Sequence, residues 1–304
     1  MILILFILDK FMSKNNISAT LIFCAYKSHS HIYRVCKALN KKYKIIVIEN
    51  SLDKKFKKDV EKKYKNTKVI IPERNVGLSK SYNIGIKKCK TKYLFLNCPD
   101  VIISNLLMKR LIDCAKQLKN FGILAPDFQN TKRFHNYIGE KKKINSKNNK
   151  LKIFKLSEVN FIDNGFFMET SKAKKYLFDE RFFLYFEVSD YCIKLKKANE
   201  KLFISEKIRF KHLGGKSVDQ KNKKIAKLTK AWHFNWSKFY YLKKNFSYLY
   251  AIYKIKNNFF SAFKKLIFNF LTLRFDECIV NFAELYGISC AIIKTKSFYR
   301  PGIK

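Results

Sequence analysis

The chain has 304 residues, of which 47% are hydrophobic, and this composition excludes general disorder. Lysine and arginine number 64 against 23 acidic residues, which gives a formal net charge of +41. So basic a surface attracts polyanions such as nucleic acid, anionic lipid or sugar phosphates, but the charge alone does not choose among them.

The cysteines and the start of the chain bear on where the protein resides. Eight cysteines are scattered without a Cys-x-x-Cys pair, which indicates reduced thiols in the cytoplasm rather than a zinc module or disulfides. The apolar run 1–8 is too short to span a membrane and lacks the features of a signal peptide. We therefore treat residues 1–15 as an N-terminal extension and leave open whether Met1 or Met12 begins the protein.

Apolar runs of strand length alternate with helical segments over residues 17–97. The predicted strands cover residues 17–25, 43–48, 68–71 and 93–97. The predicted helices cover residues 30–41 and 53–63, and a third is expected within residues 75–90. This alternation predicts an α/β fold with a Rossmann-like, mostly parallel central sheet flanked by helices, which binds ligands at the carboxyl ends of its strands.

Three later segments differ in character. The lysine-rich residues 140–152 predict a polar, flexible loop, and residues 153–215 a second, mixed portion of the fold. In residues 219–304 apolar side chains recur at helical spacing while lysines fill the other faces, which predicts an amphipathic helical region. Its apolar stripes either pack on the preceding domain or lie on an anionic membrane surface, and the excess of positive charge favours membrane contact.

Acidic residues stand at the ends of two predicted strands. Glu49 closes the second strand, and Asp100 closes the fourth after Pro99, which fixes the turn. In a nucleotide-binding sheet, one strand-end carboxylate binds ribose or base, and another holds a divalent cation such as Mn²⁺ or Mg²⁺ on the phosphates. The alternative, in which Glu49 is only a turn or cap residue, stays open.

The segments Asn75-Val76-Gly77 and Asn83-Ile84-Gly85 form a second group of candidates. Glycine lets a ligand or backbone approach closely, and asparagine amides can bridge base and phosphate. Neither a Gly-x-Gly-x-x-Gly fingerprint nor a Walker P-loop is present. An ordinary turn and helix start would have a similar sequence.

Glu187, Asp190 and His212 form the third group. The two carboxylates are three residues apart in an aromatic frame and share one face if the segment is helical. Buried carboxylates need a proton, a cation or hydrogen bonds, and this arrangement suits the removal of a proton from an incoming hydroxyl. His212 follows an apolar strand and offers a neutral imidazole ligand to a manganese-like ion.

Taken in order, these segments resemble motifs of the family 2 inverting glycosyltransferases of the GT-A fold, especially the rhamnosyltransferase-like bacterial branch. The resemblance covers about residues 17–218. It rests on Ala25-Tyr26, Ile48-Glu49-Asn50-Ser51, Asn75 to Gly85, Leu96 to Asp100, Phe178 to Cys192 and His212 to Ser217, with Ser297 to Pro301 in the tail.

The resemblance implies a nucleotide-diphosphate sugar donor, a divalent cation on the diphosphate and single-displacement transfer with inversion. It makes residues 16–218 the catalytic domain. Asp100 and His212 would hold the cation, and Glu187 or Asp190 would take the proton of the acceptor hydroxyl. The implied donor-binding residues are Ala25, Tyr26, Glu49, Asn75, Gly77, Asn83 and Asp100.

Three departures from the family pattern affect the expected chemistry. The family's Glu-Asp pair is Glu187-Val188 here, so the aspartate usually assigned as the base is missing. Cys98 replaces an asparagine, which leaves Asp100 as the only carboxylate of that motif, and Tyr82 replaces an arginine.

These observations favour a cytoplasmic glycosyltransferase, peripheral on the cell membrane, that acts on a lipid-linked or growing surface polysaccharide. Val188 motivates one alternative, a catalytically impaired paralogue that serves as a scaffold. A nucleic-acid-binding protein is the other alternative, and only the net charge favours it. The chain lacks the signature of an RRM, a KH domain, a zinc module or a basic helix, so we expect no specific nucleic acid partner.

Overall fold

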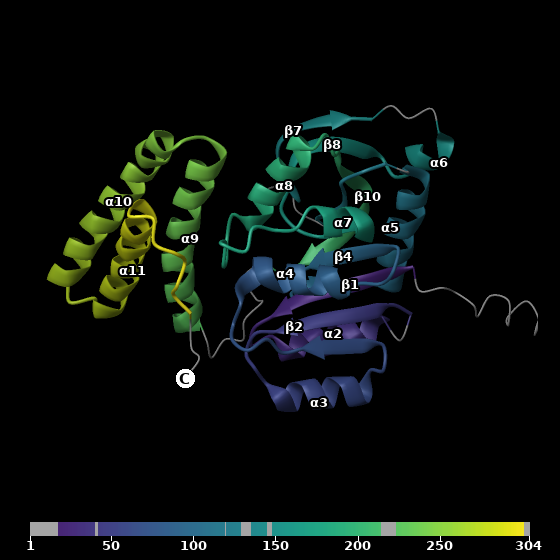
Figure 1. The fold of residues 1–304 in the computed structure, drawn as a ribbon, viewed down its shortest axis with the longest axis horizontal. Helices are drawn as coiled ribbons and strands as arrows, with labels where there is room; N and C mark the ends of the chain where they lie inside the picture. Colours follow the sequence, from purple (N-terminus) through teal and green to yellow (C-terminus); the bar gives the residue numbers. More distant parts are fainter. Residues whose placement is uncertain are drawn as a thin grey trace, which may run out of the picture.

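The computed structural model of the protein describes residues 18–39, 42–118, 120–128, 135–144, 148–213 and 223–300. Some predictions fall outside this part of the chain: the N-terminal extension with both candidate start methionines, residues 214–217 of the segment His212 to Ser217, and Pro301 of the tail segment. Within it, one mixed sheet runs in the order β3-β2-β1-β4-β9-β6-β10-β8-β7, with β5 paired to β10 (Figure 1).

The first half of the sheet is parallel, as predicted. Its strands are β1 (Ala19–Ala25), β2 (Lys44–Glu49), β3 (Thr67–Ile70) and β4 (Tyr93–Asn97), and its helices are α2 (His29–Leu39), α3 (Lys54–Lys63) and α4 (Gly77–Lys88). Each predicted element of this half is confirmed to within a few residues. The strands read as continuous apolar runs because helices cover both faces of a parallel sheet.

The second half is mixed, which also confirms the prediction. Antiparallel β9 (Phe166–Glu169) joins β4 to β6 (Ile123–Phe128). The remaining strands are β10 (Leu202–His212), β8 (Leu156–Ile162), β7 (Tyr137–Lys143) and the two-residue β5 (Val101–Ile102). The helices are α5 (Asn105–Leu118), α6 (Asn149–Lys152), α7 (Thr170–Lys175) and α8 (Glu187–Lys197).

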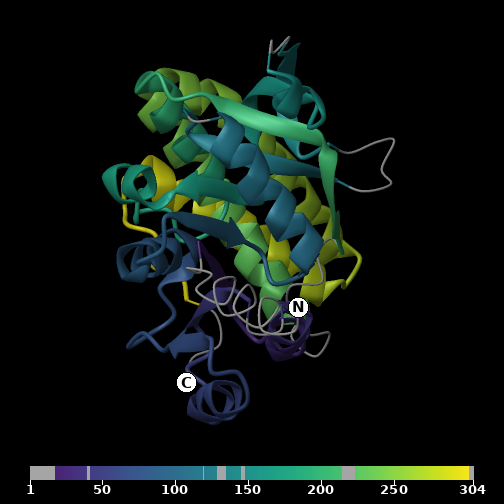
Figure 2. The same cartoon turned by 90° about the vertical axis from the view of Figure 1, so that its right-hand side faces the viewer.

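Two hydrophobic clusters fill the two sides of this sheet. One contains buried residues of α2, α3 and α5, and the other contains those of α4 and α8. Figure 2 gives the view from the side opposite the three C-terminal helices, which lie behind the sheet.

The predicted loop over residues 140–152 is wrong. Residues up to Lys143 belong to β7, which pairs with β8, and Asn149–Lys152 form the short helix α6. The lysines of β7 are exposed or half-buried, since the strand lies at the edge of the sheet. The backbone of β7 pairs with β8, and the side chain of Lys141 pairs with Glu206. Lysine on edge strands is a common protection against further strand pairing, so polarity alone misled the prediction.

The C-terminal part is helical, as predicted. It consists of α9 (Lys223–Asn245), α10 (Tyr248–Leu271) and α11 (Phe275–Ile292). Trp232, Trp236 and Phe239 of α9 pack against Ala251, Ile255 and Ile288 in a separate core. The prediction did not resolve α11, whose residues are apolar over most of its circumference and give no clear helical period.

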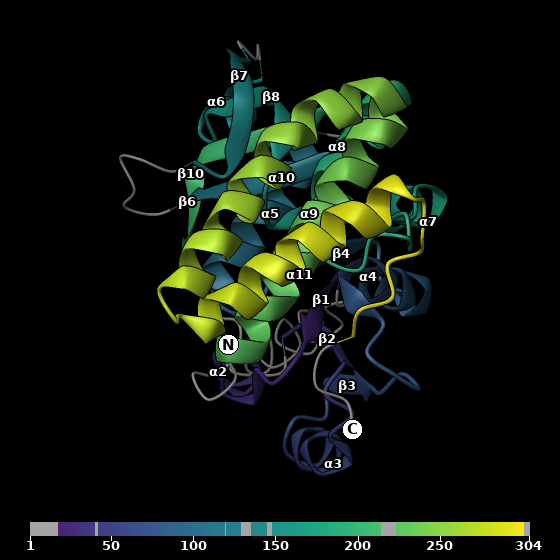
Figure 3. The same ribbon diagram turned by 90° about the vertical axis from the view of Figure 1, so that its left-hand side faces the viewer.

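These three helices stand beside the sheet, and Figure 3 looks directly onto α10 and α11. Ser237 of α9 donates to the carbonyl of Leu184 at 2.8 Å, which ties the helices to the loop before α8. None of the helices in the described residues is long and apolar enough to cross a bilayer.

Candidate active site

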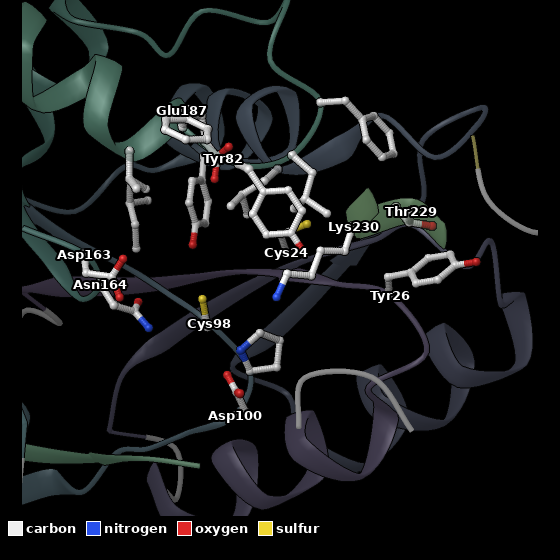
Figure 4. A pocket seen from close by; sticks show the side chains of 18 of the residues that line it. Cys24, Tyr26, Tyr82, Cys98, Asp100, Asp163, Asn164, Glu187, Thr229 and Lys230 are labelled. Atoms are coloured by element: carbon white, nitrogen blue, oxygen red, sulfur yellow. The ribbon is translucent and has the colours of Figure 1, made fainter. Parts of the chain in front are cut away.

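A cavity of about 810 Å³ lies at the carboxyl ends of β1 and β4, where a parallel sheet is expected to bind ligands. Its wall comes from these strand ends, the loop after β8, the loop before α8, and α9 (Figure 4). Asp100, Glu187 and His212, which the sequence analysis singled out from three distant segments, all line it.

Asp100 and His212 form the acidic and imidazole pair of the cavity. The two-residue strand β5 pairs with the end of β10, with His212 opposite Val101, and the N–H of Leu213 donates to the carbonyl of Asp100 at 3.1 Å. This pairing places His212 Nε2 3.3 Å from Asp100 Oδ1. The hydrogen bond with Asp100 raises the pKa of His212, against the opposing effect of burial.

This pair fits a divalent cation that is bound chiefly by phosphate oxygens. A carboxylate and an imidazole are ligands that Mn²⁺ accepts, and Mg²⁺ or Mn²⁺ on a nucleotide needs only one or two protein ligands. Among the described residues no group of three His, Cys, Asp or Glu side chains is placed to hold a metal ion. The two protein ligands are therefore sufficient for a cation that a nucleotide also binds. They are insufficient for a metal site made of protein ligands alone.

Glu187 is the first residue of α8 and lies at the opposite side of the cavity. It follows Tyr185 and Phe186, which both have positive φ values, 71° and 63°. Such left-handed backbone is costly for aromatic residues and is typical of functional sites. This turn directs the Glu187 side chain into the cavity instead of along the surface.

The environment of Glu187 suits a general base. The residue is 4% exposed, and its Oε2 is buried without a hydrogen-bond partner among the described residues. Burial raises its pKa from 4.5 to about 7, and the nearby charge of Asp163 adds to the rise, whereas a backbone hydrogen bond opposes it. A carboxylate with a pKa near neutrality can accept a proton during a reaction and release it afterwards.

Asp190 shares α8 with Glu187 but does not line the cavity. Its carboxylate accepts hydrogen bonds from Lys244 Nζ at 2.7 Å and Asn245 Nδ2 at 3.0 Å, both at the end of α9. The helix confirms that the two acids lie on one side of α8, but only Glu187 reaches the cavity. Asp190 instead holds α8 against α9.

Of the remaining predicted donor-binding residues, the structure brings Tyr26 and Asn75 to the cavity. Ala25 is fully buried, and its carbonyl accepts from the N–H of Asn50. Glu49 is also fully buried, and its two oxygens accept from the backbone N–H groups of Ser51 and Asp53 at 3.1 and 2.9 Å. Glu49 thus shapes the turn after β2, the alternative that the sequence had left open.

Gly77 and Asn83 also lie behind the cavity wall. Gly77 has a φ of +76°, and a Cβ there would lie 2.3 Å from the carbonyl oxygen of Phe183. That same oxygen accepts from the N–H of Leu78 at 2.8 Å. Asn83 exchanges hydrogen bonds with the backbone of Phe178 at 2.9 and 3.0 Å. Both residues therefore position the segment that leads to Glu187.

The sequence analysis missed three charged residues of the cavity, Asp163, Lys230 and Lys227, the last of which is paired with Glu277 of α11. Asp163 directly follows β8 and precedes Asn164-Gly165, so its position at a strand end carried the same signal as Asp100. Burial raises the pKa of Asp163, and the nearby His212 lowers it. Lys230 of α9 points its amino group into the cavity in Figure 4, but nothing distinguished it among so many lysines.

The three departures from the family pattern all fall on the cavity wall. Val188, Cys98 and Tyr82 line it. Burial raises the pKa of the Cys98 thiol far above its usual value, and the nearby Asp100 adds to this effect, so the thiol stays neutral. With cysteine at position 98, Asp100 is left as the one carboxylate of its motif.

Comparisons with known proteins agree with this fold. The sequence model of Glycosyl transferase family 2 matches residues 20–178. Curated protein sequences gave no match. The crystal structure of GalNAc-T7 with UDP, GalNAc and Mn²⁺ aligns with a TM-score of 0.52 and 13% identity, over 76% of this chain and 52% of that one.

Two structures of S. aureus TarS align with a TM-score of 0.50. One has 15% identity over 76% of this chain and 44% of that chain. The other, TarS 1–349, has 14% identity over 93% of each. The chain thus spans about half the length of the GalNAc-T7 chain and less of the longer TarS chain.

At these identities the structural likeness shows the fold alone, and that fold is GT-A. The family assignment has separate support, because the matched residues 20–178 make up more than half of the 304-residue chain. The chain therefore belongs to glycosyl transferase family 2.

Proposed function

We propose that the protein transfers a sugar from a nucleotide-diphosphate donor to a saccharide hydroxyl, with inversion, in the cavity between Asp100 and Glu187. The observation that carries this proposal is the convergence of Asp100, His212 and Glu187 on one cavity from distant parts of the chain. In this assignment residues 16–218 form the catalytic domain and residues 219–304 an appended helical region.

The donor diphosphate lies at the Asp100 end of the cavity. Asp100 and His212 would hold a divalent cation, Mn²⁺ or Mg²⁺, whose charge would offset the negative charge of the diphosphate. Lys230 contributes a second positive charge from the facing wall, where its side chain lines the same cavity. Tyr26 and Asn75 contact the nucleoside, because they lie at the end of β1 and before α4.

Glu187 takes the proton of the acceptor hydroxyl. As the acceptor oxygen bonds to the anomeric carbon, the bond from that carbon to the diphosphate breaks, and the O–H proton passes to the carboxylate. Attack opposite the leaving group inverts the anomeric configuration. The buried, partnerless Oε2 of Glu187 supports this role.

We assign the acceptor to the lipid-linked or growing surface polysaccharides of the cell envelope. The rhamnosyltransferase-like branch, and hence transfer of a hexose or rhamnose, is the finer assignment that the sequence motifs favour. The net charge of +41 supports a place on the inner, anionic face of the cell membrane. The eight cysteines are free, in keeping with a reducing cytoplasm.

A catalytically impaired paralogue is the second candidate, because Val188 stands on the cavity wall where the family resemblance expects an aspartate. The two candidates differ in turnover and not in donor binding. Restoring aspartate at position 188 separates them, since a scaffold would bind donor and stay inactive with either residue.

A thermal-shift panel of nucleotide sugars, each with and without Mn²⁺, tests the proposal. We expect at least one donor to raise the melting temperature by about 5 °C at a hundredfold excess over its Kd, in a Mn²⁺-dependent way. The Asp100→Ala variant should lose this response. A panel in which no nucleotide sugar stabilises the wild-type chain would refute the proposed donor.

A further inference from the structure

Large hydrophobic side chains that are exposed to solvent are concentrated on the C-terminal helices. Only four of those in the described residues lie before residue 246. The rest lie between Phe246 and Phe298, chiefly on α10 and α11, which together form the face seen in Figure 3. Single exposed apolar residues are ordinary, but a contiguous group of this size marks an interaction surface.

The exposed side chains follow helical spacing on both helices. On α11 they recur at intervals of three or four residues and form one stripe, Phe275, Ile279, Phe282 and Tyr286, and the exposed Ile293 directly follows the helix. On α10 a second stripe contains Leu249, Tyr253, Phe260, Phe263, Ile267 and Phe270, and Tyr248, Tyr250, Phe268 and Leu271 of the same helix are also exposed. The buried residues of α10 are two alanines and one isoleucine, Ala251, Ala262 and Ile255. Most of the apolar surface of α10 therefore faces outward.

Lysines accompany the outward face of α10. The exposed Lys254, Lys256, Lys264 and Lys265 make no salt bridge with any described residue. By contrast, Asp276 and Glu277 at the start of α11 are paired with Lys224 and Lys227 of α9 at 2.6 and 2.5 Å. The face thus combines aromatic and aliphatic side chains with unneutralised positive charge.

We propose that the outward face of α10 and α11 binds an anionic bilayer, with α10 lying in the plane of the membrane surface. Aromatic and aliphatic side chains would enter the headgroup region while the lysines contact lipid phosphates, the arrangement of interfacial amphipathic helices. A second copy of this chain is a poorer occupant, because symmetric pairing would bring the α10 lysines of two highly basic molecules together.

This docking surface lies close to the cavity. Ala226, Lys227, Lys230 and Phe234 of α9 face the cavity, whereas Trp232, Trp236 and Phe239 of the same helix pack under α10 and α11. A helix is about 10 Å thick. This arrangement keeps the cavity within a few helix diameters of the bilayer. If the protein has the proposed function, which this step assumes, a lipid-linked acceptor can reach the cavity from the membrane.

Vesicle co-sedimentation tests the inference on the full chain. The altered variant carries Phe260→Ser, Phe263→Ser and Ile267→Ser, whose side chains are 59%, 47% and 46% exposed on one side of α10. The matched control carries Leu106→Ser, Ile138→Ser and Ile153→Ser, which are 60%, 62% and 66% exposed outside the C-terminal helices. Vesicles contain phosphatidylglycerol mixed with phosphatidylcholine, or phosphatidylcholine alone.

We expect the wild type and the control to bind the phosphatidylglycerol vesicles alike and the α10 variant to bind about 100-fold more weakly. Binding to phosphatidylcholine alone should be much weaker for all three. Equal binding by the two triple variants would overturn the inference, as would a wild-type dimer in sedimentation velocity that the α10 variant loses.

Donor binding, measured in parallel without vesicles, keeps the two proposals apart. We expect the α10 variant to retain the donor-induced thermal shift of the wild type. Vesicle binding without donor binding by the wild type would leave the docking surface intact and refute only the proposed donor. Donor binding without vesicle binding by the wild type would leave the proposed donor intact and refute only the docking surface.

Discussion

Replacing Glu187 by glutamine should change both the stability and the turnover of the protein. The burial of the Glu187 carboxylate determines the direction and the pH dependence of the change in stability. The rise of its pKa from 4.5 to about 7 means that the folded protein binds a proton here that the unfolded chain has released. The stabilising effect of that proton is complete below pH 4.5 and is lost as the pH rises through about 7. The wild type should therefore lose stability between pH 5 and pH 8, and Glu187→Gln should not lose this component.

The size of the effect follows from the two pKa values. Between pH 5 and pH 8 the ionisation of Glu187 costs about 2.5 kcal/mol of folding free energy. The free energy of unfolding of Glu187→Gln relative to the wild type should rise by this amount over the same interval. Urea denaturation of both proteins at pH 5, 6, 7 and 8 measures it, and the comparison cancels groups that titrate alike in both.

Glu187→Gln should lower turnover, although it should make the fold more resistant to high pH. An amide cannot accept the acceptor proton, so we expect kcat to fall about 100- to 10,000-fold while the Kd for donor stays unchanged. The kcat of the wild type should rise with pH through about 7, where Glu187 ionises. Stability curves that run parallel for the two proteins, or a kcat that survives the substitution, would refute the assignment of Glu187 as the buried base.

Three other substitutions test the rest of the site. Asp100→Asn should lower the Mn²⁺-dependent affinity for donor at least about tenfold, measured by calorimetry with and without the metal. Lys230→Met should lower kcat/KM about 10- to 100-fold, whereas Lys224→Met on the same helix, outside the cavity, should have no effect. Gly77→Ala should destabilise the fold by about 2 kcal/mol or more in urea denaturation, because its φ is +76° and its Cβ would meet the carbonyl oxygen of Phe183.

The parallel half of the fold could be predicted from sequence because its signal is local. The strands before Glu49 and Asp100 are short apolar runs, and each is followed by turn residues and then by a helical pattern. Edge strand β7 gave no such signal. Its three lysines are consecutive and none of its residues is buried, so only its pairing with β8 makes it a strand. Such tertiary pairing is invisible to a reading of local composition.

The residues of the candidate site were likewise only partly predictable from the sequence. Asp100 and Glu187 were found because acidic residues in apolar or aromatic surroundings stand out in a sequence. Glu49 and Asp190 stood out for the same reason, yet both are held by hydrogen bonds away from the cavity. A sequence reveals that a carboxylate is enclosed, but whether it faces backbone donors, a lysine or an open cavity depends on contacts between distant segments. Lys230 is a cavity residue that the sequence did not reveal. Its local sequence resembles that of many other lysines, and only the position of α9 in the fold brings it to the cavity.

Helix α9 makes the proposed chemistry and the proposed membrane contact physically dependent on each other. Lys230 and Phe234 lie on its cavity side, while Trp232 and Trp236 on the opposite side form the core under α10 and α11. Lys244 at its end holds Asp190 at 2.7 Å, three residues from Glu187. Removal of α10 and α11 would expose both tryptophans to water and weaken the packing that fixes α9. The cavity wall that α9 forms would then lose its support, so the helical region appended to the proposed catalytic domain also contributes to the architecture of the candidate site.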